Sequence, residues 1–396
     1  MKLRLNKTVA AVASSALLLM AVPAVGIAST SGAAPKPKPK PTYVIGYEGP
    51  LSGGNLQLGL NMVFAVELAI NQANASGKNP FKLQLAKYDD QGDPTISPTE
   101  AQSAVANKKL IAIVGPAFSG ATAAAEPYYN KAHVATVSPS ATRVTLATSG
   151  WNNFFRVVAD DGVQGPADAD YLVKTKGNKS VYVVSDGSSY GTGLATAFAG
   201  QATTDGAKVT SVTVPGTAQC TDGTASATEY SAAATQAVAS GAKAMFYGGY
   251  YCDLGLFLGA LGSAGWTGPI MSGDGSDSSA LITGTTPASA ANGVLLSCAC
   301  AVSTNSLFNK SFQNLANFSS SNATYAPESY DATNVIIAAM KALKRITRPA
   351  LVAELHKISF KGITKTIKFQ SDGNIAGAAI YVNQVTNGKV VQLGLE

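Results

Sequence analysis

Short apolar runs alternate with longer stretches of helical periodicity from residue 43 onward. In the stretch 60–74, Leu60, Val63, Phe64 and Leu68 fall on one face of a helix, whereas residues 81–85 alternate between apolar and polar as a strand does. The pattern predicts strands at 43–47, 81–88, 111–114, 134–138, 181–185, 209–214, 244–247, 270–271 and 294–297. It predicts helices at 60–74, 99–108, 121–130, near Thr192, Glu229 and Leu254, at 330–345 and from Pro349, followed by a β-rich end at 366–395 with a turn at 372–374.

Alternating strands and helices are typical of parallel sheets that are covered by helices on both faces. About ten strands are more than one sheet usually holds, so we predict an α/β protein of two Rossmann-like lobes. Ligands in such folds bind outside the carboxyl ends of the strands. The loops that follow the predicted strands are therefore the places to look for a site.

The first 41 residues differ from the rest of the chain. Residues 1–7 carry three basic residues and no acid, and the apolar run 9–25 is followed by Gly26, Ile27 and Ala28. This pattern predicts a signal peptide at 1–28, cleaved after Ala28, with an uncleaved membrane anchor as the alternative. Alternating Pro and Lys then predict an extended linker at 29–41, which serves as a plain spacer or contacts an anionic envelope surface. The signal peptide predicts an exported protein of the periplasm, the cell envelope or the extracellular space. No Cys follows the apolar run, so no lipid-anchor cysteine is expected.

Charge and composition exclude several classes of protein. An apolar share of 46% and a charged share of 13% exclude a mainly disordered chain. Without the six basic residues of 1–41, the remainder has 23 basic and 23 acidic residues, so the net charge of +6 belongs to the N-terminal segments. Nucleic-acid binding, which needs a basic patch, is not expected.

The four cysteines are expected to form disulfides in an exported chain. They stand at Cys220, Cys252, Cys298 and Cys300, and three connectivities are possible. Cys220–Cys252 is the most natural pair, because a Cys298–Cys300 bridge would close a very tight ring. The spacing matches no zinc pattern, so no metal site is expected.

Residues that suit a charged small ligand follow the predicted strands. Ser119 in the loop 115–120 suits an anionic oxygen, especially at a helix N-terminus, although it could instead be an N-cap. The hydroxyls of 138–142 also suit an anionic oxygen, although this segment could be an ordinary turn. Tyr190 and Tyr250, flanked by glycines, could wall a pocket or simply pack. Asp274 could pair with a cation or shape its turn. Together they suit a zwitterion held between two lobes.

Catalytic chemistry finds no support in the sequence. The segment 187–191 lacks the spacing of a nucleophile elbow, and neither a phosphate-binding loop nor a dinucleotide fingerprint is present, so no enzyme activity and no cofactor are expected. His133 and His356 are the two histidines, which excludes a multi-histidine metal centre. Both are expected to be structural or surface residues.

Several motifs, taken in order, resemble the type I periplasmic solute-binding proteins of ABC importers, and most closely the leucine/isoleucine/valine-binding branch. They are 45–53, Tyr88-Asp89-Asp90-Gln91, Ile113-Val114-Gly115-Pro116, Ser138-Pro139-Ser140-Ala141-Thr142, Phe155-Arg156, Gln164-Gly165-Pro166, 190–195, 246–251 and Tyr330-Asp331-Ala332. Any single motif is weak, but together they extend from about Tyr43 to the C-terminus.

The resemblance implies a role for each candidate residue. Ser119 would hold the ligand α-carboxylate with its hydroxyl and N–H, and the backbone at Ser140 with the hydroxyl of Thr142 would complete the α-carboxylate and α-amino contacts. Asp274 would pair with the α-ammonium. Tyr190 and Tyr250 would line the pocket.

The resemblance also implies the organisation and function of the chain. One lobe would comprise 42–160 and 299–376 and the other 161–298 and 377–396, joined by a three-crossover hinge. The protein would capture an amino acid, by default a branched or other aliphatic one, and deliver it to an ABC transporter permease as a monomer. A related binder of an amide or aromatic acid and an exported α/β enzyme are the alternatives. Leu58 stands where relatives often carry an aromatic residue, so side-chain specificity does not carry over.

Overall fold

The computed structural model describes residues 39–216, 227–300, 302–320, 323–377 and 379–395. Residues Lys40–Glu396 form one unit, and everything below concerns that unit. The predicted signal peptide and most of the predicted linker lie outside the described residues. At the start of the unit, the Lys40 ammonium donates to the carbonyl oxygens of Gly77 and Asn79 at 2.8 and 2.6 Å. Among the described helices, none combines the length and apolar character needed to cross a membrane.

The first sheet has five parallel strands in the order β2-β1-β3-β4-β5. Its buried central strand β3 is wholly apolar, as expected for a parallel strand covered on both faces. The strands are β1 (Thr42–Gly49), β2 (Lys82–Asp89), β3 (Leu110–Val114), β4 (Ala135–Ser138) and β5 (Phe154–Arg156). The helices that belong to this lobe are α1 (Leu56–Ala75), α2 (Ser97–Ala106), α3 (Ser119–Lys131), α4 (Thr145–Thr148), α11 (Ser306–Ala316), α12 (Ala326–Ala342) and α13 (Arg348–Leu355).

The second sheet has seven strands in the order β14-β13-β10-β9-β8-β6-β7. Strands β10, β9, β8, β6 and β7 are parallel, and the C-terminal hairpin β13–β14 adds antiparallel strands next to β10. The strands are β6 (Ser180–Ser185), β7 (Lys208–Thr213), β8 (Ala244–Gly248), β9 (Ile270–Ser272), β10 (Leu295–Cys298), β13 (Tyr381–Thr386) and β14 (Lys389–Leu395). The helical elements are α5 (Asp161–Ala169), η1 (Asp170–Thr175), α6 (Ser189–Thr204), η2 (Ala227–Tyr230), α8 (Ser231–Ala239), α9 (Tyr251–Ala264), η3 (Asp274–Ser276), α10 (Ser279–Gly284) and η4 (Ala288–Ala291).

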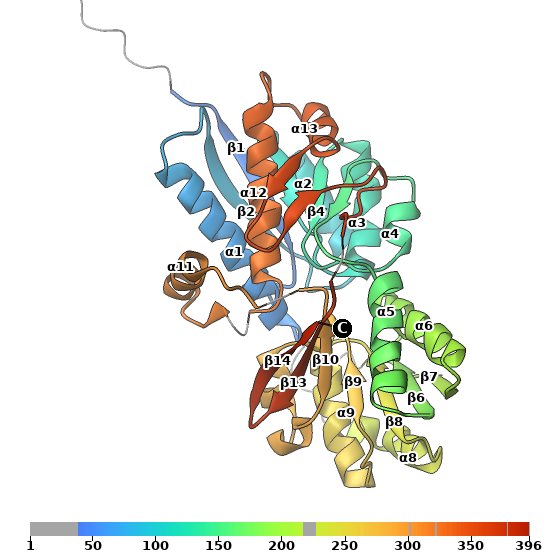
Figure 1. The fold of residues 1–396 in the computed structure, drawn as a ribbon. Coiled ribbons are helices and arrows are strands. Elements are labelled where there is room, and N and C mark those ends of the chain that lie inside the picture. Colours follow the sequence, from blue (N-terminus) through green and yellow to red (C-terminus); the bar gives the residue numbers. More distant parts are fainter. Residues whose placement is uncertain (1–38, 217–226, 301, 321–322, 378, 396) are drawn as a thin grey trace, which may run out of the picture. The chain divides into compact units, whose positions relative to one another are not determined.

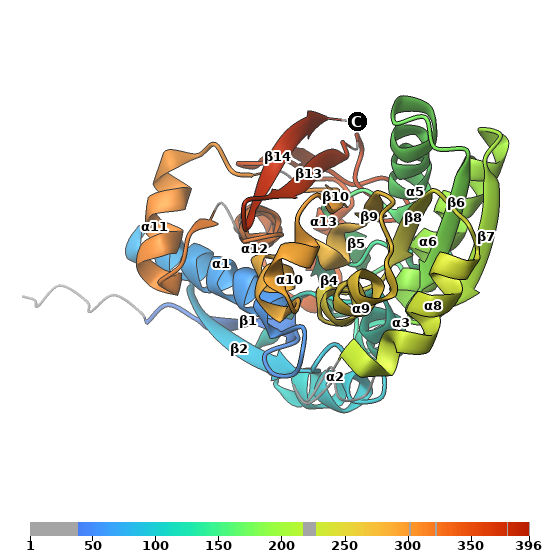
Figure 2. The ribbon, with the colours of Figure 1, turned by 90° about the horizontal axis from the view of Figure 1, so that it is seen from below.

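The chain passes between the two sheets three times (Figure 1). It leaves the first sheet after β5, returns after β10 to form α11–α13 and the small hairpin β11 (Ser359–Lys361)–β12 (Thr366–Lys368), and crosses again to β13. Helix α12 belongs to the first lobe, since it packs on β3, β4 and α1. Figure 2 shows α1, α11 and α12 grouped together. The predicted fold class, two α/β lobes with three crossovers, is confirmed.

Some elements differ from the prediction. The three-residue strand β5 is too short to show a period, and it was not predicted. Helix α11 was also not predicted, although its buried Phe308, Phe312 and Ala316 recur at a helical spacing of four. Helix α12 begins at Ala326, four residues earlier than predicted, because Pro327 is accommodated in the first turn of a helix.

The bridge between Cys298 and Cys300, which was disfavoured because it closes a very tight ring, is present. They are joined by a disulfide, and their Cα atoms lie 4.9 Å apart, within the range that disulfides span. The chain bends directly after β10, which brings the two residues close enough despite their separation of two. Cys252 is also disulfide-bonded. The predicted Cys220–Cys252 pair involves Cys220, which lies outside the described residues.

Candidate functional site

Loops from the carboxyl ends of strands in both sheets surround one small cavity. Space between the protein atoms amounts to about 250 Å³, and five of the six candidate residues line it: Ser119, Ser140, Tyr190, Tyr250 and Asp274. Thr142, the sixth, is buried two residues beyond Ser140 and is not among the lining residues. The loops that the strand-end rule selected therefore meet at one cavity.

Ser119 occupies the first helical position of α3 and is not an N-cap. The N-cap position belongs to Phe118, which makes no side-chain capping hydrogen bond. The Ser119 hydroxyl oxygen accepts the Arg143 backbone N–H at 3.2 Å, so its own hydrogen can be donated to a ligand. The positive end of the helix dipole, the backbone N–H groups and this hydroxyl together suit a carboxylate.

The loop after β4 is held by serine hydroxyls. Ser138 Oγ donates to the Pro116 carbonyl at 2.8 Å and accepts the Ala141 N–H at 3.0 Å. Ser140 Oγ donates to the Ala117 carbonyl at 2.7 Å. Because the Ser140 hydroxyl holds the two loops together, its backbone is the part left to serve a ligand.

Asp274 is buried in the cavity wall and is bound by two tyrosines. Tyr190 donates to its Oδ1 at 2.9 Å, and Tyr325 donates to its Oδ2 at 2.7 Å. Burial raises the pKa of Asp274, and these two hydrogen bonds partly offset the rise. No described residue forms an ion pair with Asp274. A ligand ammonium would supply the missing positive charge.

Glycines allow the turn around Asp274 to approach Tyr190 closely. A Cβ at Gly273 would lie 2.7 Å from the Tyr190 hydroxyl oxygen, and one at Gly275 would lie 2.6 Å from its ring. The Gly275 N–H donates to the same hydroxyl at 2.9 Å. The position of Tyr190 therefore depends on the small residues that flank Asp274.

Aromatic rings form much of the remaining wall. The ring centroid of Tyr250 lies 4.2 Å from that of Phe118 and 5.1 Å from that of Tyr190. Leu58 and Met62 of α1 complete the apolar part. The cavity lining thus combines anion-binding groups at Ser119, a carboxylate at Asp274 and apolar surface.

Sequence reasoning missed Phe118 and Tyr325 as lining residues. Phe118 stands next to Ser119 in a loop that follows a strand, so the strand-end rule could have included it. Tyr325 precedes α12, and no strand end precedes it, so that rule could not find it. Its backbone has φ of 66°, an uncommon conformation for a bulky residue, which places its hydroxyl on Asp274.

Polar contacts join the two lobes around the cavity. The guanidinium of Arg143 donates through one nitrogen to the backbone oxygen and the hydroxyl of Ser189, at 2.6 and 2.8 Å. The Gln57 N–H donates to the Tyr251 hydroxyl at 3.1 Å. With Tyr325 on Asp274 and Phe118 on Tyr250, these contacts hold the lobes closed over the cavity.

Asp161, the first residue of α5, is a second buried acid close to the site. Burial, reinforced by the charge of Asp274, raises its pKa to about 8, while Thr142 lowers it. Neither carboxylate oxygen has a well-formed hydrogen bond among the described residues, and the same holds for the Thr142 hydroxyl. Of the two acids, Asp274 is the one that lines the cavity.

Comparison with known proteins agrees with the two-lobed architecture. The family model described as periplasmic binding protein matches residues 42–389. The chain therefore belongs to the periplasmic binding protein family. Its fold is shared by the branched-chain amino acid substrate-binding protein LivJ of Streptococcus pneumoniae, solved in complex with isoleucine. That structure is 25% identical, with a TM-score of 0.79, and the match covers 90% of this chain and 99% of that one.

Curated relatives match over shorter stretches. An amino acid binding protein of Pseudomonas aeruginosa is 33% identical over 166 residues, which cover 42% of this chain and 44% of the relative. The chain thus spans less than half the length of that relative. A Rhodopseudomonas palustris solute-binding protein solved with benzoate has a TM-score of 0.76 at 19% identity, covering 89% of this chain and 96% of that one, which shows the fold alone.

Proposed function

We propose that this protein is an exported solute-binding protein that captures an amino acid between its lobes and delivers it to the permease of an ABC transporter. Relatives named as amino acid and Leu/Ile/Val-binding proteins, and similar folds solved with leucine or isoleucine, support this function. The mechanism is capture, closure and docking, with no chemical step.

The observation that carries the proposal is that one cavity is lined both by hydrogen-bond donors that suit a carboxylate, at Ser119 and the start of α3, and by the Asp274 carboxylate, which suits an ammonium. An amino-acid carboxylate would accept from the Ser119 hydroxyl and from N–H groups at the start of α3, with the Ser140 backbone and the Thr142 hydroxyl nearby. Its ammonium would bind Asp274. Burial away from water strengthens both interactions, because charge-assisted hydrogen bonds gain strength in a low dielectric.

The cavity walls favour a small aliphatic side chain. Leu58, Met62, Phe118, Tyr190 and Tyr250 line it with apolar surface. A branched-chain amino acid is our first choice of ligand.

We propose that ligand exchange requires the lobes to separate. The moving bodies would be residues 42–160 with 299–376, and residues 161–298 with 377–396. Breaking the Arg143–Ser189, Gln57–Tyr251, Tyr325–Asp274 and Phe118–Tyr250 contacts would open the cavity. We expect the protein to act outside the cytoplasm, as a monomer.

A thermal-shift screen of the exported protein against all common amino acids, GABA and D-amino acids tests the function. Binding to the native state alone raises the unfolding midpoint, by about 3 °C at a hundredfold excess over Kd. We expect one small chemical group of amino acids to stabilise the protein. Stabilisation by benzoate or an amide and by no amino acid would contradict the proposal.

A further inference from the structure

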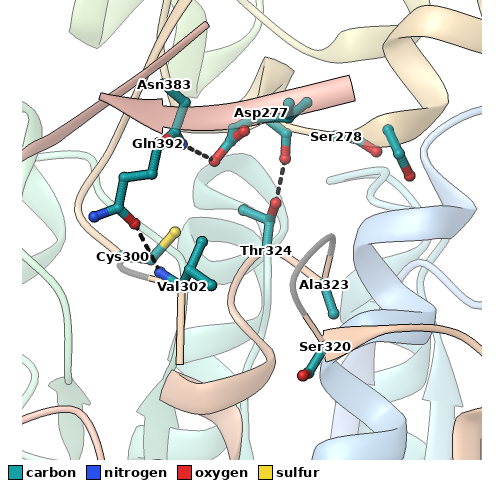
Figure 3. Close-up of a pocket in the computed structure, with 11 residues that line it drawn as sticks. Asp277, Ser278, Cys300, Val302, Ser320, Ala323, Thr324, Asn383 and Gln392 are labelled. Atoms are coloured by element: carbon teal, nitrogen blue, oxygen red, sulfur yellow. Dashed lines mark hydrogen bonds between the residues drawn. The ribbon is translucent and has the colours of Figure 1, made fainter. Parts of the chain in front are cut away.

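A second pocket lies where four chain segments meet beside the crossovers, and it shares no lining residue with the ligand cavity. Its walls come from the turn after η3, the chain after β10, the segment before α12 and the hairpin β13–β14 (Figure 3). The space between its atoms amounts to about 430 Å³, continuous with solvent. The two sites use neighbouring residues of the chain. Asp277 of the second pocket follows η3, which begins with Asp274 of the ligand cavity, and Thr324 of the second pocket directly precedes Tyr325 of the cavity.

Oxygen acceptors dominate this second pocket. The Asp277 carboxylate is buried and accepts at Oδ2 from the Asn383 amide at 2.9 Å. Asn383 is 5% exposed, and its own side-chain oxygen has no hydrogen-bond partner within the described part of the chain. Ser279 and Ser320 also line the pocket.

Positive charge is missing from the pocket. None of its described lining residues is Lys, Arg or His, and no described basic group pairs with Asp277. A buried carboxylate beside an unpaired carbonyl oxygen is costly unless a cation or donor binds them. The unpaired side-chain oxygen of Asn383 is a second observation, separate from the Asp277 carboxylate, and it also indicates a ligand that is a cation or a hydrogen-bond donor.

Cys298 and Cys300 stand beside Asp277, with the sulfurs and a carboxylate oxygen all within 4.8 Å of one another. The sulfurs are joined in a disulfide, so they cannot act as thiolate ligands for a soft metal. The remaining donors are oxygen atoms of a carboxylate and an amide. Oxygen donors from two separate segments suit Ca²⁺ or Na⁺ better than Mg²⁺, which demands near-ideal octahedral geometry.

We propose that this pocket binds a hard, oxygen-liganded cation, Ca²⁺ or Na⁺, through Asp277 and the side-chain oxygen of Asn383. Bound water would complete the coordination. Such a cation would join the turn after η3 to the hairpin β13–β14.

The test uses the exported chain, treated with chelator and dialysed into choline chloride, without amino acid. Its unfolding midpoint is measured with CaCl₂, NaCl or MgCl₂ at constant ionic strength, and calorimetric titration of the wild type with each salt measures binding directly. We expect Ca²⁺ or Na⁺ to raise the midpoint, by about 3 °C at a hundredfold excess over Kd, and Mg²⁺ to raise it less.

Two variants assign the effect to the pocket. Asp277→Asn should lose the response to the cation, and Asn383→Leu should weaken it, with folding checked by circular dichroism. Glu67→Gln, which removes a surface carboxylate from the first lobe, should keep the full response. No cation-specific shift or heat with the wild type, or an undiminished response in a folded Asp277→Asn, would overturn the proposal and leave a water-filled pocket. Because no amino acid is present, failure here does not bear on the proposed transport function.

Discussion

The ring of Phe118 stacks on the ring of Tyr250, with centroids 4.2 Å apart and planes 19° apart. Phe118 belongs to the first lobe and Tyr250 to the second, so the stack exists only when the lobes are closed. Phe118→Leu should weaken ligand binding about 2- to 12-fold, because an aromatic pair contributes about 0.5–1.5 kcal/mol beyond its buried area. Calorimetric titration measures the loss.

A matched control for that stack lies within the first lobe. Phe64 packs edge-on against Phe318, with ring centroids 6.0 Å apart, and neither residue lines the cavity. Phe64→Leu should lower the unfolding midpoint while leaving ligand affinity unchanged. Equal affinity losses in both variants would mean that the Phe118 effect reflects general destabilisation.

Ligand affinity should fall with decreasing pH because an ammonium needs an ionised Asp274. The pKa of this carboxyl is raised by burial, so affinity is lost as pH falls through a value above the usual aspartate pKa of about 3.9. Tyr325→Phe removes a hydrogen bond that lowers the pKa, and the loss should then begin at a higher pH. Tyr330→Phe, whose hydroxyl bonds Gln72, should leave the profile unchanged. Identical profiles for wild type and Tyr325→Phe would contradict the assignment of the pH dependence to Asp274.

Stability should decline with increasing pH because several buried carboxyls have raised pKa values. Glu126 is one of them, raised by burial from 4.5 to about 7. A raised pKa means that the folded state holds the proton more tightly, so its contribution is full below the unfolded pKa and is lost as pH rises through about 7.

Glu126→Gln mimics the protonated acid and should remove this part of the decline. The substitution changes the free energy of unfolding at each pH. That change should be more stabilising at pH 9 than at pH 5, by about 1–3 kcal/mol. Urea unfolding at both pH values measures the difference. An equal effect of Glu126→Gln at both pH values would count against a raised pKa.

Gly275→Ala tests how closely Tyr190 must approach Asp274. The added Cβ would meet the Tyr190 ring at 2.6 Å and the Gly249 carbonyl oxygen at 2.9 Å. We expect a loss of about 1–3 kcal/mol in stability, with ligand affinity reduced as well, since the ring must shift. Gly284→Ala in α10, where the added atom meets nothing, serves as control in urea unfolding and titration. Unchanged affinity in Gly275→Ala would show that the position of Tyr190 is not critical.

Local pattern predicted most of the framework and the cavity, and its failures have physical causes. Strand ends led to Ser119 and Asp274 because apolar runs and turn residues are visible in a single sequence. Tyr325 reaches Asp274 from 51 residues away, and only tertiary packing of α12 brings them together. The Cys298–Cys300 bridge depends on a local bend after β10 that composition does not reveal.

The central claim is that Asp274 binds the ammonium of an amino-acid ligand, and one titration series tests it most directly. The best amino acid from the screen and the same acid without its amino group are each titrated into wild type and Asp274→Asn. Losing one partner of a buried charge pair costs about 2–5 kcal/mol, so the variant should bind the amino acid about 100-fold more weakly. The deaminated acid should bind both proteins equally and weakly. An Asp274→Asn variant that folds and binds the amino acid as tightly as wild type does would contradict the account.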